Sequence, residues 1–152
     1  MIDIISQLLG AFFAIFGLSI IFSVPKKYLW ITGLIGIVGW GVYLLMGNFT
    51  DSMYLSNFVG ALGIGLSAQI SARIFKLPVT TFTIPGIMTL VPGSGMYNTV
   101  YYLIAGDEIL SREYMIQTLL NAGSIAIGIF LMGTLFTFIF SRRKKHEYED
   151  VI

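Results

Sequence analysis

Five long apolar stretches follow one another along the chain, and short polar or proline-containing segments separate them. A membrane-spanning helix needs about 20 predominantly apolar residues. The pattern therefore predicts five spans, which cover about residues 4–22, 28–46, 53–75, 79–106 and 114–140. We expect an all-α polytopic membrane protein, because helices satisfy every backbone hydrogen bond within lipid. Residues 1–141 would then form a single transmembrane helical domain.

Composition agrees with this membrane assignment and excludes several functions. Hydrophobic residues make up 56% of the chain and charged residues 11%, whereas about a quarter of the residues in a soluble domain are charged. The net charge of +1 gives no basic surface for nucleic acid. With no cysteine, the chain has no disulfide, thiolate metal site or thiol nucleophile.

The distribution of basic residues predicts the orientation of the spans. If the five spans alternate in direction, Lys26, Lys27, Arg73, Lys76 and the basic run 142–145 all fall on one side. Basic residues accumulate on the cytoplasmic side of membrane proteins, so we expect the N-terminus outside and residues 142–152 as a short cytoplasmic tail. The same count favours a full crossing by the fourth segment, because a re-entrant loop would place the basic tail outside.

The fourth segment differs from the others because it contains two Pro-Gly pairs, Pro85-Gly86 and Pro92-Gly93. Each proline lacks an N–H and leaves a carbonyl of the preceding turn without its helical donor. In hydrocarbon such a carbonyl costs several kcal/mol unless protein or a wet cavity satisfies it. We predict that the span is broken at both pairs. Broken helices are typical of transporter binding sites, although a proline kink can also serve packing alone.

A helix that restarts after Pro92-Gly93 would present free N–H groups with partial positive charge, which suits a carboxylate. The predicted substrate-binding residues are Pro85, Gly86, Pro92, Gly93, Ser94, Gly95, Tyr97 and Asn98. Tyr97 has a second interpretation, as part of an interfacial aromatic cluster with Tyr101 and Tyr102. The amides of Asn57, Gln69 and Asn121 need hydrogen-bond partners, either between helices or at a cavity.

The chain offers no constellation for catalysis, a cofactor or a metal. Its acidic residues lie at the ends of the predicted spans, and its one histidine, His146, lies in the predicted tail. No phosphate-binding G-x-x-x-x-G-K-[ST] motif is present. We therefore expect no enzymatic activity, no catalytic residue, no cofactor and no metal. Glycine and alanine recur at helical spacing within the spans, which predicts close helix packing inside the chain or against another chain.

The segment FKLPVTTFTIPGIMTLVPGSGMY resembles the signature of the threonine/serine exporter family, in its small subunit that corresponds to the C-terminal half. The resemblance extends over about residues 25–140. The motif positions that carry it are Pro78, Ile84-Pro85-Gly86, Leu90-Val91-Pro92-Gly93 and Tyr97.

The resemblance implies a two-component exporter in the bacterial inner membrane. The expected partner is a larger membrane subunit that corresponds to the N-terminal half of the family. The implied substrates are small amino acids such as threonine and serine, or a related dicarboxylate. An alternative from another class is a membrane scaffold that transports nothing and uses the fourth segment to dock a larger partner.

Overall fold

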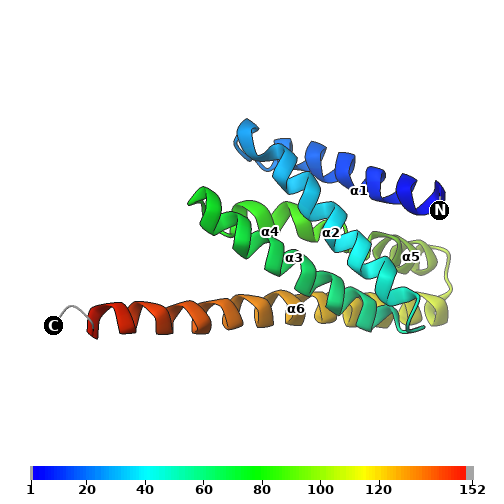
Figure 1. The fold of residues 1–152 in the computed structure, drawn as a ribbon. Coiled ribbons are helices and arrows are strands. Elements are labelled where there is room, and N and C mark those ends of the chain that lie inside the picture. Colours follow the sequence, from blue (N-terminus) through cyan, green and yellow to red (C-terminus); the bar gives the residue numbers. More distant parts are fainter. Residues whose placement is uncertain (1, 150–152) are drawn as a thin grey trace.

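The computed structural model describes the backbone of residues 2–149 and the side chains of residues 3–139. All regular structure in this part of the chain is helical (Figure 1). The elements are α1 (Ile2–Ile21), the short 3-10 helix η1 (Lys26–Tyr28), α2 (Leu29–Gly47), α3 (Met53–Phe75), α4 (Thr80–Ile87), α5 (Gly93–Ile104) and α6 (Glu108–Glu149). The predicted all-α polytopic fold is confirmed.

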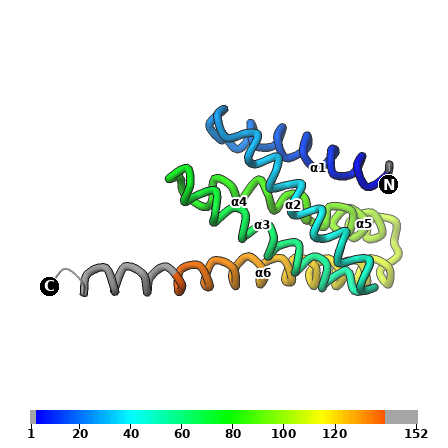
Figure 2. The backbone as a smooth tube through the Cα atoms, viewed as in Figure 1, coloured from blue at the N-terminus to red at the C-terminus, as the bar shows by residue number. Residues whose placement is uncertain are grey.

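The chain runs back and forth between two ends of a helical bundle (Figures 1 and 2). Helices α1, α2, α3 and α6 pack in that order, each against the next, and each is long and apolar enough to cross a membrane. Helices α4 and α5 have only 8 and 12 residues. They follow one another from the end of the bundle where α3 stops to the end where α6 starts, as the predicted crossing by the fourth segment requires.

The fourth segment is broken once, and the predicted break at Pro85-Gly86 is wrong. Helix α4 continues through this pair to Ile87 because its packing against α2 and α3 outweighs one missing backbone donor. Pro85 is fully buried, and a Cβ on Gly86 would lie 2.9 Å from side-chain atoms of both Ile35 and Ile64. The break lies at residues 88–92, directly before Gly93, as the second pair predicts.

Helix α6 begins earlier than the hydropathy pattern predicts. Asp107 caps it, since its Oδ1 accepts a hydrogen bond of 3.0 Å from the N–H of Leu110. The residues expected to form a polar connection before residue 114 are therefore the first turns of a helix that starts at Glu108. At the other end α6 reaches Glu149. The side chains of 140–149 and all of residues 150–152, and so the predicted tail chemistry, lie outside the described residues.

Small residues let the long helices approach closely inside the chain. A Cβ on Gly36 of α2 would lie 2.8 Å from Cγ1 of Ile15 in α1, and a Cβ on Gly65 of α3 would lie 2.9 Å from Cβ of Met132 in α6. In lipid the hydrophobic effect does not drive helices together, so close van der Waals contacts of this kind stabilise their association instead. Gly123 of α6 has no neighbour within 4 Å of such a Cβ, so part of that helix surface is left open.

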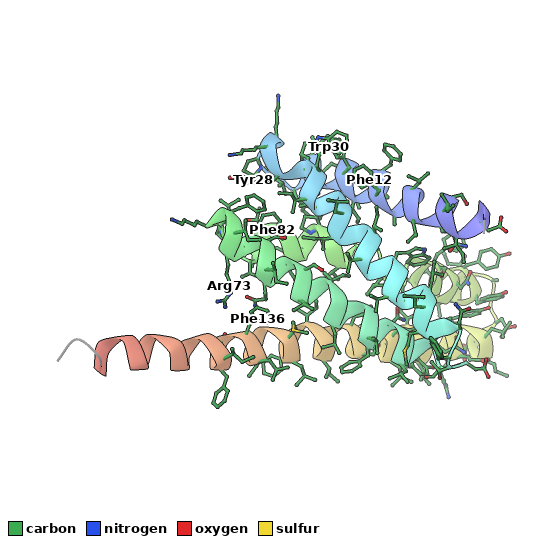
Figure 3. The ribbon with its side chains drawn as sticks, viewed as in Figure 1. Phe12, Tyr28, Trp30, Arg73, Phe82 and Phe136 are labelled. Carbon is green, nitrogen blue, oxygen red and sulfur yellow. The ribbon has the colours of Figure 1, made fainter. Side chains whose placement is uncertain are left out.

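Among residues 3–139, every basic residue except Arg112 lies at one end of the bundle, and the acidic residues lie at the other. The basic residues at 26, 27, 73 and 76 lie at the end where α2 and α4 begin. The acidic residues at 3, 51, 107, 108 and 113 lie at the end where α1, α3 and α6 begin. At the basic end the guanidinium of Arg73 lies over the ring of Phe136, 5.1 Å from its centroid (Figure 3). This separation supports the orientation predicted from the positive-inside rule.

Candidate functional site

The break in the fourth segment leaves the N-terminus of α5 with unused backbone donors. Pro92 is the N-cap and has φ −76° and ψ 61°, and no side chain caps the helix. The N–H of Gly93 donates to the carbonyl of Val91 at 2.8 Å. In the described part of the chain, no hydrogen bond is donated by the N–H of Ser94 or of Gly95. Two donors with partial positive charge are therefore available at this helix end.

Ser94 and Gly95 line a cavity of about 470 Å³ that α2, α3, α5 and α6 form with the break. Such a volume is typical of sites for small molecules, which occupy about 300–1,000 Å³. Residues from five parts of the chain line the cavity, and none of them carries a charge. The cavity can therefore bind a polar ligand through hydrogen bonds and helix-end dipoles, without a fixed counter-ion.

Five of the eight predicted site residues come together on this cavity. They are Pro92, Gly93, Ser94, Gly95 and Asn98. Their common position follows from local structure, because all of them lie at the end of the break or in the first turns of α5.

The other three predicted residues lie elsewhere. Pro85 and Gly86 pack inside the bundle, as described above. Tyr97 is 67% exposed, and its ring stacks on that of Tyr101 with centroids 6.0 Å apart. Tyr101 in turn meets Tyr102, whose ring stacks on Tyr114. The exposed pair Tyr97 and Tyr101 on α5 fits the interfacial interpretation of Tyr97, whereas Tyr114 belongs to α6 and lines the cavity.

Gly95 has a packing role that the sequence did not reveal. A Cβ at this position would collide with Oγ1 of Thr118 in α6. A second contact holds the two helices together, because the Ser111 hydroxyl donates to the carbonyl of Thr99 at 2.9 Å. The close contact at Gly95 and the hydrogen bond from Ser111 therefore hold the N-terminal turns of α5 against α6.

Two asparagines that the sequence left open both line the cavity and join helices. The Nδ2 of Asn57 in α3 donates to the Oδ1 of Asn121 in α6 at 2.9 Å. Both side chains are almost fully buried, with exposures of 5% and 6%. Gln69, the third candidate amide, does not line this cavity and lies near Gly133 instead.

Sequence reasoning missed the remaining polar and aromatic lining residues. On α6 these are Tyr114, Gln117 and Thr118, which with Asn121 follow the i, i+3, i+4, i+7 spacing of one helix face. This spacing of polar residues could have predicted a polar face on the helix from the sequence alone. On α2 they are Trp40 and Tyr43, whose rings stack with centroids 5.0 Å apart.

An all-helical bundle with four helices long and apolar enough to cross a membrane, and with a cavity at the break between two shorter helices, is typical of a polytopic membrane protein of the transporter type. The sequence profile described as Threonine/Serine exporter, ThrE, matches residues 7–135. The match covers most of the chain, so the chain belongs to the threonine/serine exporter family and is a membrane exporter rather than an enzyme. The predicted family membership is confirmed. No solved structure matches the chain.

Proposed function

We propose that this chain is the smaller membrane subunit of a two-component exporter in the bacterial inner membrane. Its substrate is a small amino acid such as threonine or serine, or a related small carboxylate. The substrate carboxylate is bound by the N–H groups of Ser94 and Gly95. The observation that carries the proposal is that Ser94 and Gly95, whose N–H groups donate no hydrogen bond among the described residues, both line a cavity without charged residues.

The physical argument concerns what the N-terminus of a helix can bind in a cavity whose lining carries no charge. Unpaired N–H groups and the helix dipole favour a carboxylate there. The amide of Asn98, one turn further along α5, lines the same cavity and can hydrogen-bond polar atoms of the ligand. The ligand would thereby satisfy the backbone groups that the break leaves unpaired in the membrane.

A larger membrane subunit is the proposed partner, and an apolar groove is the surface proposed for it. The groove measures about 680 Å³ and lies between the break and α6. Its lining includes Ile87, Val91, Met96 and Leu119, which are incompletely covered within the chain. A helix of the larger subunit in this groove would lie directly beside the break and would narrow access to the cavity from lipid.

The test is efflux of labelled threonine and serine from cells that express this chain with the larger subunit. Asn98→Ala removes a cavity amide and should reduce efflux by about tenfold, since a lost hydrogen bond to a charged or polar ligand is worth roughly 1.5 kcal/mol. Asn48→Ala is the matched control, because Asn48 lies at the C-terminal end of α2 and does not line the cavity. Co-purification of the larger subunit is measured for both variants.

The outcome separates transport from scaffolding. If Asn98 contributes to a substrate site, Asn98→Ala reduces efflux while the larger subunit still co-purifies. If the chain is only a scaffold, Asn98→Ala either loses the larger subunit or leaves efflux unchanged. Either result would contradict the proposal.

A further inference from the structure

The side chain of Asn57 presents an unused acceptor to the cavity. Its Nδ2 donates to Asn121, whereas no hydrogen bond to its Oδ1 is found among the described residues. Every fully buried side-chain nitrogen and oxygen in residues 3–139 has a hydrogen-bond partner. The Oδ1 of Asn57 therefore remains accessible, and the space that it can reach is the cavity that this residue lines.

The neighbours of Asn57 fix this orientation of its amide. The Nδ2 of Asn121 donates to Sδ of Met53 at 3.4 Å, so the Oδ1 of Asn121 is left to face Asn57. An oxygen in that position requires a donor, and the amide of Asn57 must turn its Nδ2 toward it. Its carbonyl oxygen is consequently directed away from Asn121.

An aromatic pair from α2 adds a second feature that favours positive charge. The stacked rings of Trp40 and Tyr43 line the same cavity. The Nε1 of Trp40 donates to Oε1 of Gln7 at 3.2 Å, which holds the indole in place. Aromatic faces attract cations through their quadrupole, most strongly in sites shielded from water. The cavity thus has donors at the α5 side and an acceptor with aromatic rings at the α2 and α3 side.

We propose that the Oδ1 of Asn57, together with the rings of Trp40 and Tyr43, is the subsite for the ammonium group of the substrate. This inference rests on the proposed function, because it takes the substrate carboxylate to lie at the N-terminus of α5. It assigns the cavity to zwitterionic amino acids and against dicarboxylates. A second carboxylate would have no cationic side chain in the cavity and would meet the carbonyl of Asn57 instead.

The experiment compares three probes in proteoliposomes that contain the full chain with its larger subunit. The probes are L-threonine, 3-hydroxybutanoate, which is the same molecule without its ammonium group, and succinate. The wild-type protein should prefer threonine over 3-hydroxybutanoate by about 10- to 100-fold, the range expected for a hydrogen bond to a charged group. In Asn57→Leu this preference should fall toward unity.

Gln117→Leu is the matched control, because it removes another amide from the cavity lining but leaves the hydrogen bond that orients Asn57 intact. It should retain the preference for threonine even if total transport falls. Asn57→Asp keeps an acceptor of the same shape and should retain or increase the preference for threonine over succinate. This variant keeps the test decisive if Asn57→Leu fails to fold.

The results separate this inference from the proposed function. Equal transport of threonine and 3-hydroxybutanoate by the wild type overturns the ammonium subsite while export itself stands. The same conclusion follows if Asn57→Leu keeps the preference, if both Leu variants lose it equally, or if Asn57→Asp shifts toward succinate. A wild-type protein that transports none of the three probes overturns the proposed function as well.

Discussion

Gly128 of α6 lies directly against Ala61 of α3. A Cβ on Gly128 would be 2.8 Å from the Cβ of Ala61 and 2.8 Å from the carbonyl oxygen of Phe58. Ala61 is completely buried. The glycine at this position is therefore required by the distance between two backbones, and not by the conformation of either one.

Gly128→Ala should destabilise the bundle, because the added methyl group forces α6 away from α3. The expected cost is about 1–3 kcal/mol, the range for overpacking a close contact. Thermal unfolding of the purified protein in detergent measures it. Gly123→Ala is the control on the same helix, since a Cβ there meets nothing within 4 Å, and it should leave the unfolding temperature unchanged or raise it slightly. Equal effects of the two substitutions would contradict this account of the α3–α6 contact.

Gly95→Ala should reduce transport, because its methyl group would collide with Thr118 and displace the N-terminus of α5. A displacement of about 1 Å in a binding group can cost on the order of 100-fold in function, so we expect a loss of tenfold or more in threonine efflux. Gly47→Ala is the control, as Gly47 ends α2 with open space around it. Wild-type efflux from Gly95→Ala would show that the position of this helix end does not matter.

Pro92→Ala should separate stability from transport. Proline at this position prevents the helix from running on, and it also disfavours helical geometry at Val91. Alanine restores a backbone donor, and it lifts the penalty of about 3 kcal/mol that proline would impose on a helix continuing through this position. We expect an unfolding temperature at or above that of the wild type, together with reduced efflux as the break narrows. Lower stability with normal efflux is the contrary result.

The direction of each crossing can be read with single cysteines, because the natural chain has none. Asp51→Cys and Glu108→Cys should react with a membrane-impermeant maleimide in intact cells. Lys27→Cys and Lys76→Cys should react only after the membrane is opened. Position 76 precedes the broken segment and position 108 follows it, so labelling of both from the same side would refute a full crossing by α4 and α5.

The number of crossings was predictable because lipid imposes long apolar helices, and the hydropathy pattern records that requirement directly. Helix ends were less predictable. The start of α6 depends on the cap at Asp107, a local signal that the hydropathy pattern does not contain. Helix α4 continues through Pro85 because of tertiary packing. The burial of α4 compensates for the backbone donor that proline lacks, and the sequence alone shows only the lack of that donor.

The candidate site also has a part that local sequence predicts and a part that depends on tertiary contacts. The part at residues 92–98 was predictable, because a proline and the helix start after it act within a few residues of the chain. The part at Asn57 was not, because its partner Asn121 is 64 positions away in sequence. The polar spacing along α6 marked one wall of the cavity, but nothing in the sequence said which helix would face that wall.

The uncharged lining of the cavity also constrains how export can be driven. Each elementary charge moved across a membrane gains about 2.3 kcal/mol per 100 mV of potential. A zwitterion carries no net charge, and none of the residues that line the cavity adds one. Voltage therefore performs no net work on a zwitterion in this cavity, so the membrane potential acting on the substrate and this lining does not by itself drive export.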